Sequence, residues 1–143
     1  MAIIVRRIQR MDVNNGLVDV LNNLSPTSDA KRLARTYWQW SKGRKAVYVA
    51  IDDSINKVIG TGSIFIEHKP THDPSKPVGH IEDVVVLKSR EKEGVGTKIM
   101  QALIAHAKSF YCRKIILSCT LDNTSYYAKF GFVSSEVSMR LDL

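Results

Sequence analysis

One stretch near the middle of the chain restricts the possible folds more than any other: GHIEDVVVLKSREKEGVGTKIM, residues 79–100. It begins with an apolar, β-branched run typical of a buried strand, and after two glycines it continues as an amphipathic helix. A second apolar, β-branched run, RKIILSC, follows that helix at residues 113–119. A strand, a crossover helix and a strand in one sheet predict a right-handed unit with parallel strands over residues 79–119.

The other segments add strands and helices on both sides of this unit. Apolar positions at spacings of three and four predict a helix capped by Asp12, a helix opened by Asp29 and ended by Gly43, and a short helix over residues 122–130. The helix over residues 94–110 is expected to bury Val95, Ile99, Leu103, Ala107 and Phe110. Further strands are expected at residues 3–9, 46–52, 58–68 and 132–141, with a proline-rich loop at 69–78. The order β-α-α-β-β-β-α-β-α-β predicts a mixed α/β (α+β) domain in which helices cover one sheet.

The composition fits a single soluble domain over residues 1–143. With 44% hydrophobic and 24% charged residues the chain is ordinary for a globular protein, and no run approaches the roughly 20 apolar residues of a membrane span. The first residues do not read as a signal peptide, so a cytoplasmic location is expected.

The formal net charge of +7 attracts anions, whereas the dispersed cations argue against nucleic acid as a partner. Cys112 and Cys119 are expected to be small core or near-core residues.

The glycine turn ahead of the central helix has the features of an anion site. Gly94 and Gly96 let the backbone turn tightly and let a ligand approach closely. The first N–H groups of the helix have no partner within it, and the helix dipole adds positive potential there. Lys88, Arg90 and Lys92 add positive charge nearby. The same glycines are also compatible with a plain turn, and the pattern is not a P-loop because no G-K-[ST] follows at the required spacing.

Two adjacent carboxylates, Glu82 and Asp83, stand in the apolar strand before this turn. Neighbouring residues of a strand face opposite sides of a sheet, so both can hardly be solvated if both faces are covered. Burial would raise the pKa of a carboxyl toward neutrality and suit it to act as a general base for an amine. The alternative is one acid at the end of the sheet and the other in a salt bridge. His68, His72 and His80 are near in the sequence, but only His80 and Glu82 share a strand face, and two ligands are too few for a metal site.

Together these stretches resemble the GNAT superfamily of acetyl-CoA-dependent N-acetyltransferases. Within it the chain is similar to the glucosamine-6-phosphate N-acetyltransferase family over residues 6–139, most densely in GTGSIFIEHKPTH (60–72), GHIEDVVV (79–86) and KIILSCTLDNTSYYAKFGF (114–132). The resemblance implies direct transfer of the acetyl group of acetyl-CoA to the 2-amino group of D-glucosamine 6-phosphate in a ternary complex, toward UDP-N-acetylglucosamine. It also implies an intertwined homodimer whose sites are completed across the interface.

The resemblance further implies roles for individual residues. Glu82 would accept the proton of the attacking amine, Asp83 would act beside it, and the Tyr127 hydroxyl would help the CoA thiolate to leave. Acetyl-CoA would contact Val84, Val85, Val86, Lys92, Glu93, Gly94, Val95, Gly96, Thr97, Asn123 and Tyr127. The sugar phosphate would contact Ser25, Lys69, Pro70, Thr71, His72, Glu82, Asp83 and Arg140. The resemblance implies no metal.

Four positions depart from the family pattern, and one of them is Lys92, which stands where a further glycine is common. Glu91 stands where the turn usually begins with glutamine or arginine, and Ser118 stands where relatives often carry aspartate. Asp142 falls where an arginine of the family reaches the sugar phosphate, and Arg140 is the nearest substitute. These departures leave two alternatives open: an acetyltransferase acting on another amine, such as a polyamine or a peptide, and a non-catalytic sensor that binds CoA.

Overall fold

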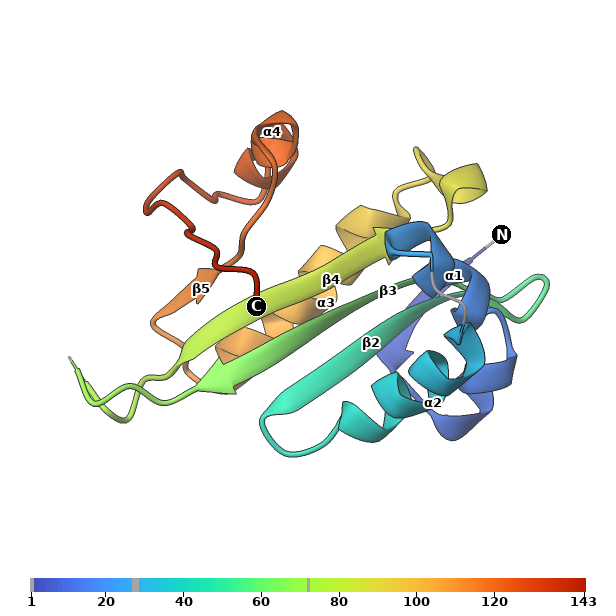
Figure 1. Cartoon of the computed structure of the whole chain (residues 1–143), viewed down its shortest axis with the longest axis horizontal. Coiled ribbons are helices and arrows are strands. Elements are labelled where there is room, and N and C mark those ends of the chain that lie inside the picture. The colour runs from blue at the N-terminus through green and yellow to red at the C-terminus, as the bar shows by residue number, and fades with distance from the viewer. Residues whose placement is uncertain (1, 27–28, 72) are drawn as a thin grey trace.

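A single mixed sheet organises the chain in the computed structural model, which describes residues 2–26, 29–71 and 73–143. Five strands form this sheet in the order β1-β2-β3-β4-β5 (Figure 1). They are β1 (Ile3–Arg7), β2 (Lys45–Asp52), β3 (Lys57–Glu67), β4 (Val78–Val86) and β5 (Lys114–Ile116). Neighbouring strands are antiparallel from β1 to β4, whereas β5 runs parallel to β4. The mixed α/β fold and the parallel unit predicted over residues 79–119 are therefore confirmed.

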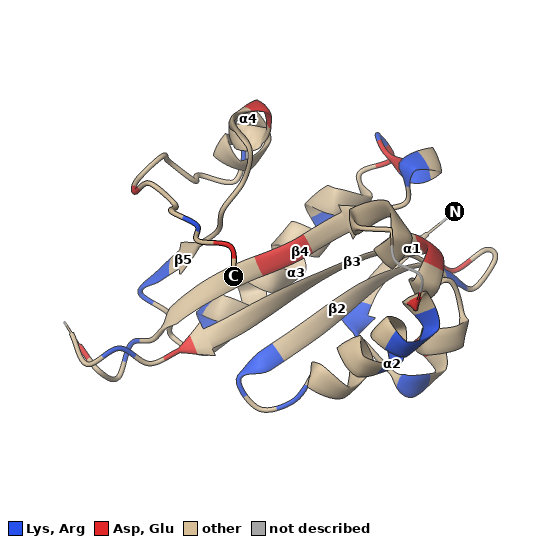
Figure 2. Cartoon of the chain, viewed as in Figure 1, with Lys and Arg blue, Asp and Glu red and all other residues tan. Residues whose placement is uncertain are grey.

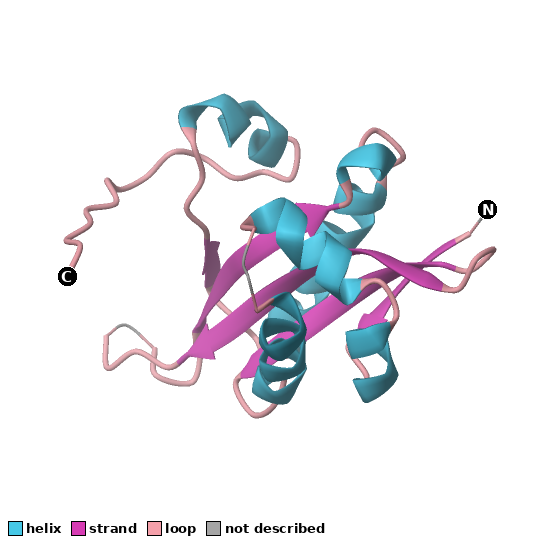
Figure 3. Cartoon of the chain, turned by 45° about the vertical axis from the view of Figure 1, so that its right-hand side comes forward, coloured by secondary structure: helices cyan, strands magenta, loops and turns pink. Residues whose placement is uncertain are grey.

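Helices cover both faces of the sheet (Figure 3). On one face lie α1 (Leu17–Leu24) and α2 (Ala30–Trp40), and on the other lies α3 (Val95–Ser109), which connects β4 to β5. The shorter elements are η1 (Arg10–Asn14), η2 (Lys88–Arg90), η3 (Leu121–Asn123) and α4 (Thr124–Ala128). Among the described residues, no helix is both long enough and apolar enough to cross a membrane.

Strand β2 shows how the two faces divide the core. Its alternate residues Val47, Val49 and Ile51 pack with α1 and α2, while Ala46 and Ala50 pack with α3. The helices contribute Leu17, Val20, Leu21, Ala34 and Tyr37 to the first core and Val95, Ile99, Met100, Leu103 and Ala107 to the second. The apolar face predicted for α3 is confirmed at four of its five positions.

Phe110 is the fifth, and the expectation that it is buried was wrong. It follows the last residue of α3, is 45% exposed and lies with its ring centroid 4.9 Å from that of His106. Of the two cysteines, Cys112 is half-buried against the core of α3, as expected, but Cys119 is exposed.

Asp12 does not cap a long helix, as the sequence had suggested. Residues Arg10–Asn14 form a 3-10 turn, and α1 begins only at Leu17, after Gly16 with φ +102°. The Asp12 carboxylate is fully buried and accepts hydrogen bonds from Arg6 Nη1 at 2.8 Å and Nη2 at 2.9 Å. It also accepts from the Gln9 N–H at 2.7 Å, so every donor is local, and the paired charges offset the desolvation of the carboxylate.

The C-terminal segment differs most from its prediction. Strand β5 has only three residues, with Ile116 exposed, and residues 132–141 form no strand. The chain after α4 continues as a loop without helix or strand, and Figure 3 shows it ending away from the sheet. Its apolar side chains, Val133, Val137, Met139 and Leu141, are between 83% and 92% exposed. A strand needs a neighbouring strand for its backbone hydrogen bonds, and among the described residues no strand pairs with this segment.

Candidate functional site

A β-bulge in β4 positions the two predicted carboxylates. Thr61 of β3 pairs with Val85 and Ser63 pairs with Glu82, so Asp83 and Val84 together face the single residue between them on β3. Asp83 has φ +56°, a left-handed conformation that a regular strand does not contain. The bulge interrupts the alternation of side chains between the two faces of the sheet. The expectation that Glu82 and Asp83 face opposite sides rested on that alternation and therefore does not apply here.

Both carboxylates are exposed, so the predicted burial was wrong. Helices α1 and α2 cover only part of their face of the sheet, and the acidic band in the middle of β4 has no helix in front of it (Figure 2). Tyr37 of α2 is buried nearby, and burial raises its pKa to about 12, with the Asp83 and Glu82 charges adding to the rise. Glu82 and Asp83 therefore line an open polar surface beside the core that α1 and α2 form with the sheet.

On the other side of the bulge, β4 separates from β5. The two strands pair only from Val78 to His80, which leaves the rest of β4 without a strand on that edge. A cavity of about 720 Å³ lies there, between the end of β4, the start of α3 and α4. Of the predicted acetyl-CoA residues, it is lined by Val84, Val85, Val86, Lys92, Gly94, Val95, Gly96, Thr97, Asn123 and Tyr127. One cavity thus gathers positions that are up to 43 residues apart, from 84 to 127.

The turn before α3 is built from left-handed residues. Lys92 has φ +72° and Gly94 has φ +81°, and α3 begins at Val95. The first hydrogen bond along the helix is donated by the Lys98 N–H to the Gly94 carbonyl at 3.2 Å. The N–H groups of residues 95–97 precede it and have no partner within the helix, which makes this end of α3 suited to an anion.

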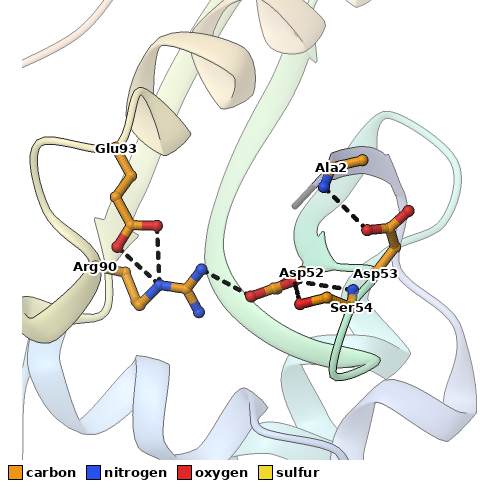
Figure 4. A network of polar contacts seen from close by, with 6 residues as sticks. All are labelled: Ala2, Asp52, Asp53, Ser54, Arg90 and Glu93. Atoms are coloured by element: carbon orange, nitrogen blue, oxygen red, sulfur yellow. Dashed lines mark hydrogen bonds and ion pairs between the residues drawn. The ribbon is translucent and has the colours of Figure 1, made fainter.

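Two polar contacts, Arg90 with Asp52 and Lys88 with Asn23, hold this turn against the rest of the fold, and a third lies within the turn. Arg90 donates from Nη2 to Asp52 Oδ2 at 2.7 Å and from Nε to Glu93 Oε2 at 2.8 Å (Figure 4). The Lys88 N–H donates to Asn23 Oδ1 of α1 at 2.7 Å. Glu93 does not line the cavity, and its carboxylate is directed to Arg90 instead. Arg90, expected to add positive charge near the turn, lines the cavity and also pairs with two carboxylates of the protein, which fixes the shape of the turn.

Two adjacent tyrosines of α4 close the cavity. Burial raises the pKa of Tyr127, and the neighbouring Tyr126 and Cys119 add to the rise, so the Tyr127 phenol keeps its proton near neutral pH. The rings of Tyr126 and Tyr127 meet edge to face with centroids 5.1 Å apart. Sequence reasoning singled out Tyr127 and missed Tyr126, although the Y-Y pair of a five-residue helix was a visible signal.

Comparison with known proteins agrees with this geometry. The profile of the acetyltransferase (GNAT) family matches residues 16–132. The chain belongs to the GNAT family. Glucosamine 6-phosphate N-acetyltransferase 1 of Oryza sativa subsp. japonica is 33% identical to it over 141 residues, which cover 96% of this chain and 85% of that protein.

Solved GNAT structures share the fold. The crystal structure of glucosamine-6-phosphate N-acetyltransferase from Arabidopsis thaliana superposes with a TM-score of 0.89 at 28% identity and covers 99% of both chains. An aminoglycoside N-acetyltransferase in complex with CoA superposes with a TM-score of 0.81 at 19% identity, over 99% of this chain and 95% of that one. The second likeness concerns the fold alone.

The residues that the GNAT resemblance assigns to the sugar phosphate are dispersed in this chain. Lys69 pairs with Glu67 at 3.1 Å, and His80 Nε2 lies 2.8 Å from the same carboxylate. Lys69 and then His80 lower the pKa of Glu67. Pro70 and Thr71 follow in a surface loop, Ser25 lies just after α1, and His72 is outside the described residues.

Arg140 is exposed in the C-terminal segment, where its Nε lies 3.0 Å from Asp142 Oδ1. Among the described residues, no hydrogen bond or ion pair joins Arg140, Lys69 or Ser25 to Glu82 or Asp83. In the same described ranges, no three His, Cys, Asp or Glu side chains come together as metal ligands. Ten of the residues predicted to bind acetyl-CoA therefore line one cavity of the single chain, whereas no contact brings Arg140, Lys69 or Ser25 to the two acids among the described residues.

Proposed function

We propose that this GNAT enzyme transfers the acetyl group of acetyl-CoA to the 2-amino group of D-glucosamine 6-phosphate, giving N-acetyl-D-glucosamine 6-phosphate and CoA. The observation that carries the proposal is the cavity between β4 and α4, because it brings ten of the eleven predicted acetyl-CoA positions together next to the exposed acids of the β4 bulge. The relatives that cover nearly the whole chain are named for this reaction. The product would feed UDP-N-acetylglucosamine synthesis in the cytoplasm.

The geometry fits acetyl-CoA in an extended pose. The free edge of β4 at residues 84–86 offers backbone N–H and C=O groups to the amides of the pantetheine arm. The unpaired N–H groups at residues 95–97 offer donors to the pyrophosphate. Lys88 and Lys92 line the same cavity and add positive charge. Glu91 also lines it, so we expect its carboxylate to weaken binding without preventing it.

The proposed transfer step uses Glu82 beside the β4 bulge and Tyr127 of α4. In the ternary complex the sugar amine attacks the carbonyl carbon of the thioester, a C–N bond forms and the C–S bond breaks. Glu82, directly or through a water molecule, receives the proton that the amine loses, and Asp83 helps to hold the sugar. Tyr127 donates its phenolic proton or a hydrogen bond to the departing thiolate. This route needs no covalent acyl-enzyme.

We further propose a homodimer that completes the sugar-phosphate half of the site. Support comes from the C-terminal segment, which carries four exposed apolar side chains and pairs with no strand among the described residues, and from the uncovered face of β4. If residues 132–141 add a strand to the sheet of a second copy, Arg140 of one copy is carried toward the site of the other. Ser25, Lys69, Pro70, Thr71 and His72 would supply the remaining contacts.

The decisive experiment measures thiol release from acetyl-CoA with glucosamine 6-phosphate and, in parallel, with unphosphorylated glucosamine. Fast release on the phosphate ester alone is expected, because the phosphate supplies binding energy that positions the amine. Arg140 is paired with Asp142 in the single chain, which keeps a second candidate open: acetyl transfer to another amine. If neither sugar causes thiol release but a polyamine or peptide does, that candidate would be established and the proposal overturned. Binding of acetyl-CoA without turnover on any amine would indicate a sensor.

A further inference from the structure

The hydroxyl of Tyr126 lies directly over the glycine at the amino end of α3. A methyl group placed on Gly96 would come within 2.6 Å of the Tyr126 hydroxyl oxygen, and the Thr97 side chain lies beside the same hydroxyl. Because real Cβ atoms do not approach an oxygen so closely, the phenol occupies the space that only a glycine leaves open. Helix α4 thereby contacts the first turn of α3.

This position places a side-chain donor among backbone donors. The N–H groups of residues 95–97 have no partner within α3, since the first helical hydrogen bond is donated by Lys98. The Tyr126 side chain lines the same cavity as Gly94, Gly96 and Thr97. An anion bound by these N–H groups would therefore lie within reach of the phenol.

The phenol is fixed in direction and uncharged. Its ring packs edge-on against Tyr127 at 5.1 Å and Phe130 at 5.5 Å, and the Lys129 ammonium lies 5.9 Å from the ring centroid. Burial raises the pKa of Tyr126, with Thr97 acting in the opposite direction, so the hydroxyl keeps its proton near neutral pH. A neutral, immobilised phenol donates to a phosphate oxygen without adding like charge and with little loss of side-chain entropy.

We propose that Tyr126 is a phosphate-positioning residue: its hydroxyl donates a hydrogen bond to a phosphate group of CoA bound at the amino end of α3. The proposal rests on the proposed acetyl-CoA binding. It extends the site from backbone donors to a side chain that also touches Tyr127. One tyrosine would then act on the phosphate end of the co-substrate and its neighbour on the thioester end.

The test compares two acetyl donors in the Tyr126→Phe variant. With acetyl-CoA, kcat/KM should fall about tenfold, the size expected for losing one hydrogen bond to a charged group, and the loss should lie in KM. With S-acetylpantetheine, which lacks the phosphates, kcat/KM should stay within about twofold of the wild type. A thermal melt of both proteins confirms that the variant is folded.

A double-variant cycle supplies an independent test. Gly96→Ala should weaken CoA binding in the wild-type background, because the new methyl displaces the phenol. In the Tyr126→Phe background the same substitution should weaken CoA binding by a smaller factor, so that the two losses do not add, since the clash with the phenol oxygen is gone and the nearest ring carbon, Cζ, would be 3.6 Å from the methyl, an ordinary contact.

The outcomes separate the possible failures. Equal losses with both donors would mean that Tyr126 acts only by holding Tyr127, and would overturn the proposal. Unchanged kcat/KM with acetyl-CoA would show that the hydroxyl makes no phosphate contact and would also overturn it. If the wild type itself does not bind CoA in calorimetry, acetyl-CoA binding fails first, and this inference fails with it.

Discussion

Arg90 donates from Nη2 to Asp52 Oδ2 at 2.7 Å, and this contact joins the turn before α3 to the end of β2, 38 residues earlier in the chain (Figure 4). The Asp52 side chain is only 4% exposed and also accepts from the Ser54 N–H at 2.9 Å. Glu93 and then Asp52 raise the pKa of Arg90 above its ordinary value. The proposed phosphate turn is thus braced by an ion pair between Arg90, which lines the cavity, and Asp52, which does not.

Removing this brace should affect CoA binding and acid stability together. Asp52→Asn should raise the Kd for CoA several-fold, because the turn must then be ordered on binding. The Ser54 hydroxyl, followed by Arg90, lowers the pKa of Asp52, so its contribution to stability is present above about pH 4 and is lost as the pH falls through the lowered value. The variant should therefore melt below the wild type at pH 7, and the gap should close toward pH 3.

Asp53→Asn is the matched control, since Asp53 is the exposed neighbour and accepts only from the Ala2 N–H among the described residues. Melting curves from pH 3 to 7 and calorimetry with CoA check both variants. A pH-independent gap for Asp52→Asn, or an equal effect of Asp53→Asn on CoA binding, would contradict the proposed brace.

The local parts of this architecture were predictable from the sequence, and the non-local parts were not. The boundaries and buried face of α3 follow from its apolar spacing and from Gly94, which are properties of a few neighbouring residues. The bulge at Asp83 depends on the register between β3 and β4, which no local pattern encodes. The role of Arg90 depends on Asp52, which the fold brings close from another strand. Residues 132–141 show apolar residues suited to a strand, but their expected partner belongs to another copy of the chain.

Tyr127→Phe should lower turnover far more than it weakens acetyl-CoA binding. Stabilisation of the thiolate develops only in the transition state, so removal of the hydroxyl should reduce kcat about 100-fold. The Kd for acetyl-CoA should change by no more than about twofold because the packing of the ring against Phe132 is retained. Steady-state kinetics and calorimetry check this result, with Tyr111→Phe as control, since Tyr111 is 77% exposed. An unchanged kcat would remove Tyr127 from the mechanism.

Glu82→Gln tests the other end of the transfer. It should lower kcat/KM for the sugar about 100-fold or more by removing the proton acceptor, while the Kd for acetyl-CoA stays near the wild-type value. The side chain is exposed, and Ser63 donates to the Glu82 carbonyl rather than to its carboxylate, so the bulge should survive the substitution. Loss of CoA binding in this variant would point to a structural role for Glu82 and would contradict the assignment.

Gly16→Ala and Gly43→Ala form a matched pair for stability. Both glycines have positive φ, +102° and +61°, so both substitutions introduce backbone strain of about 1 kcal/mol. Only at Gly16 would the new methyl also meet backbone, 2.7 Å from the Val58 carbonyl oxygen. We therefore expect roughly 3 kcal/mol of destabilisation for Gly16→Ala and about 1 kcal/mol for Gly43→Ala in urea unfolding. An equal loss of unfolding free energy in the two variants would show that the α1–β3 junction rearranges to accommodate the methyl group.

Deletion of residues 133–143 tests whether the C-terminal segment assembles two copies. The full chain should sediment at about twice the 16.1 kDa mass of one copy, and the shortened chain as a single copy. All residues that line the proposed acetyl-CoA cavity precede the deletion, so CoA binding should persist. Turnover on glucosamine 6-phosphate should be lost, because the sugar-phosphate half of the site is expected from the second copy.

Charged substitutions locate the contact without shortening the chain. Val137→Asp combined with Met139→Asp should give single copies, since both side chains are about 90% exposed in one copy and would be buried in the pair. Ile55→Asp is the control, because Ile55 is 57% exposed in the β2–β3 turn, away from the proposed contact. If the shortened chain still forms pairs, the copies associate through another surface, and the proposed delivery of Arg140 to a neighbouring site is wrong.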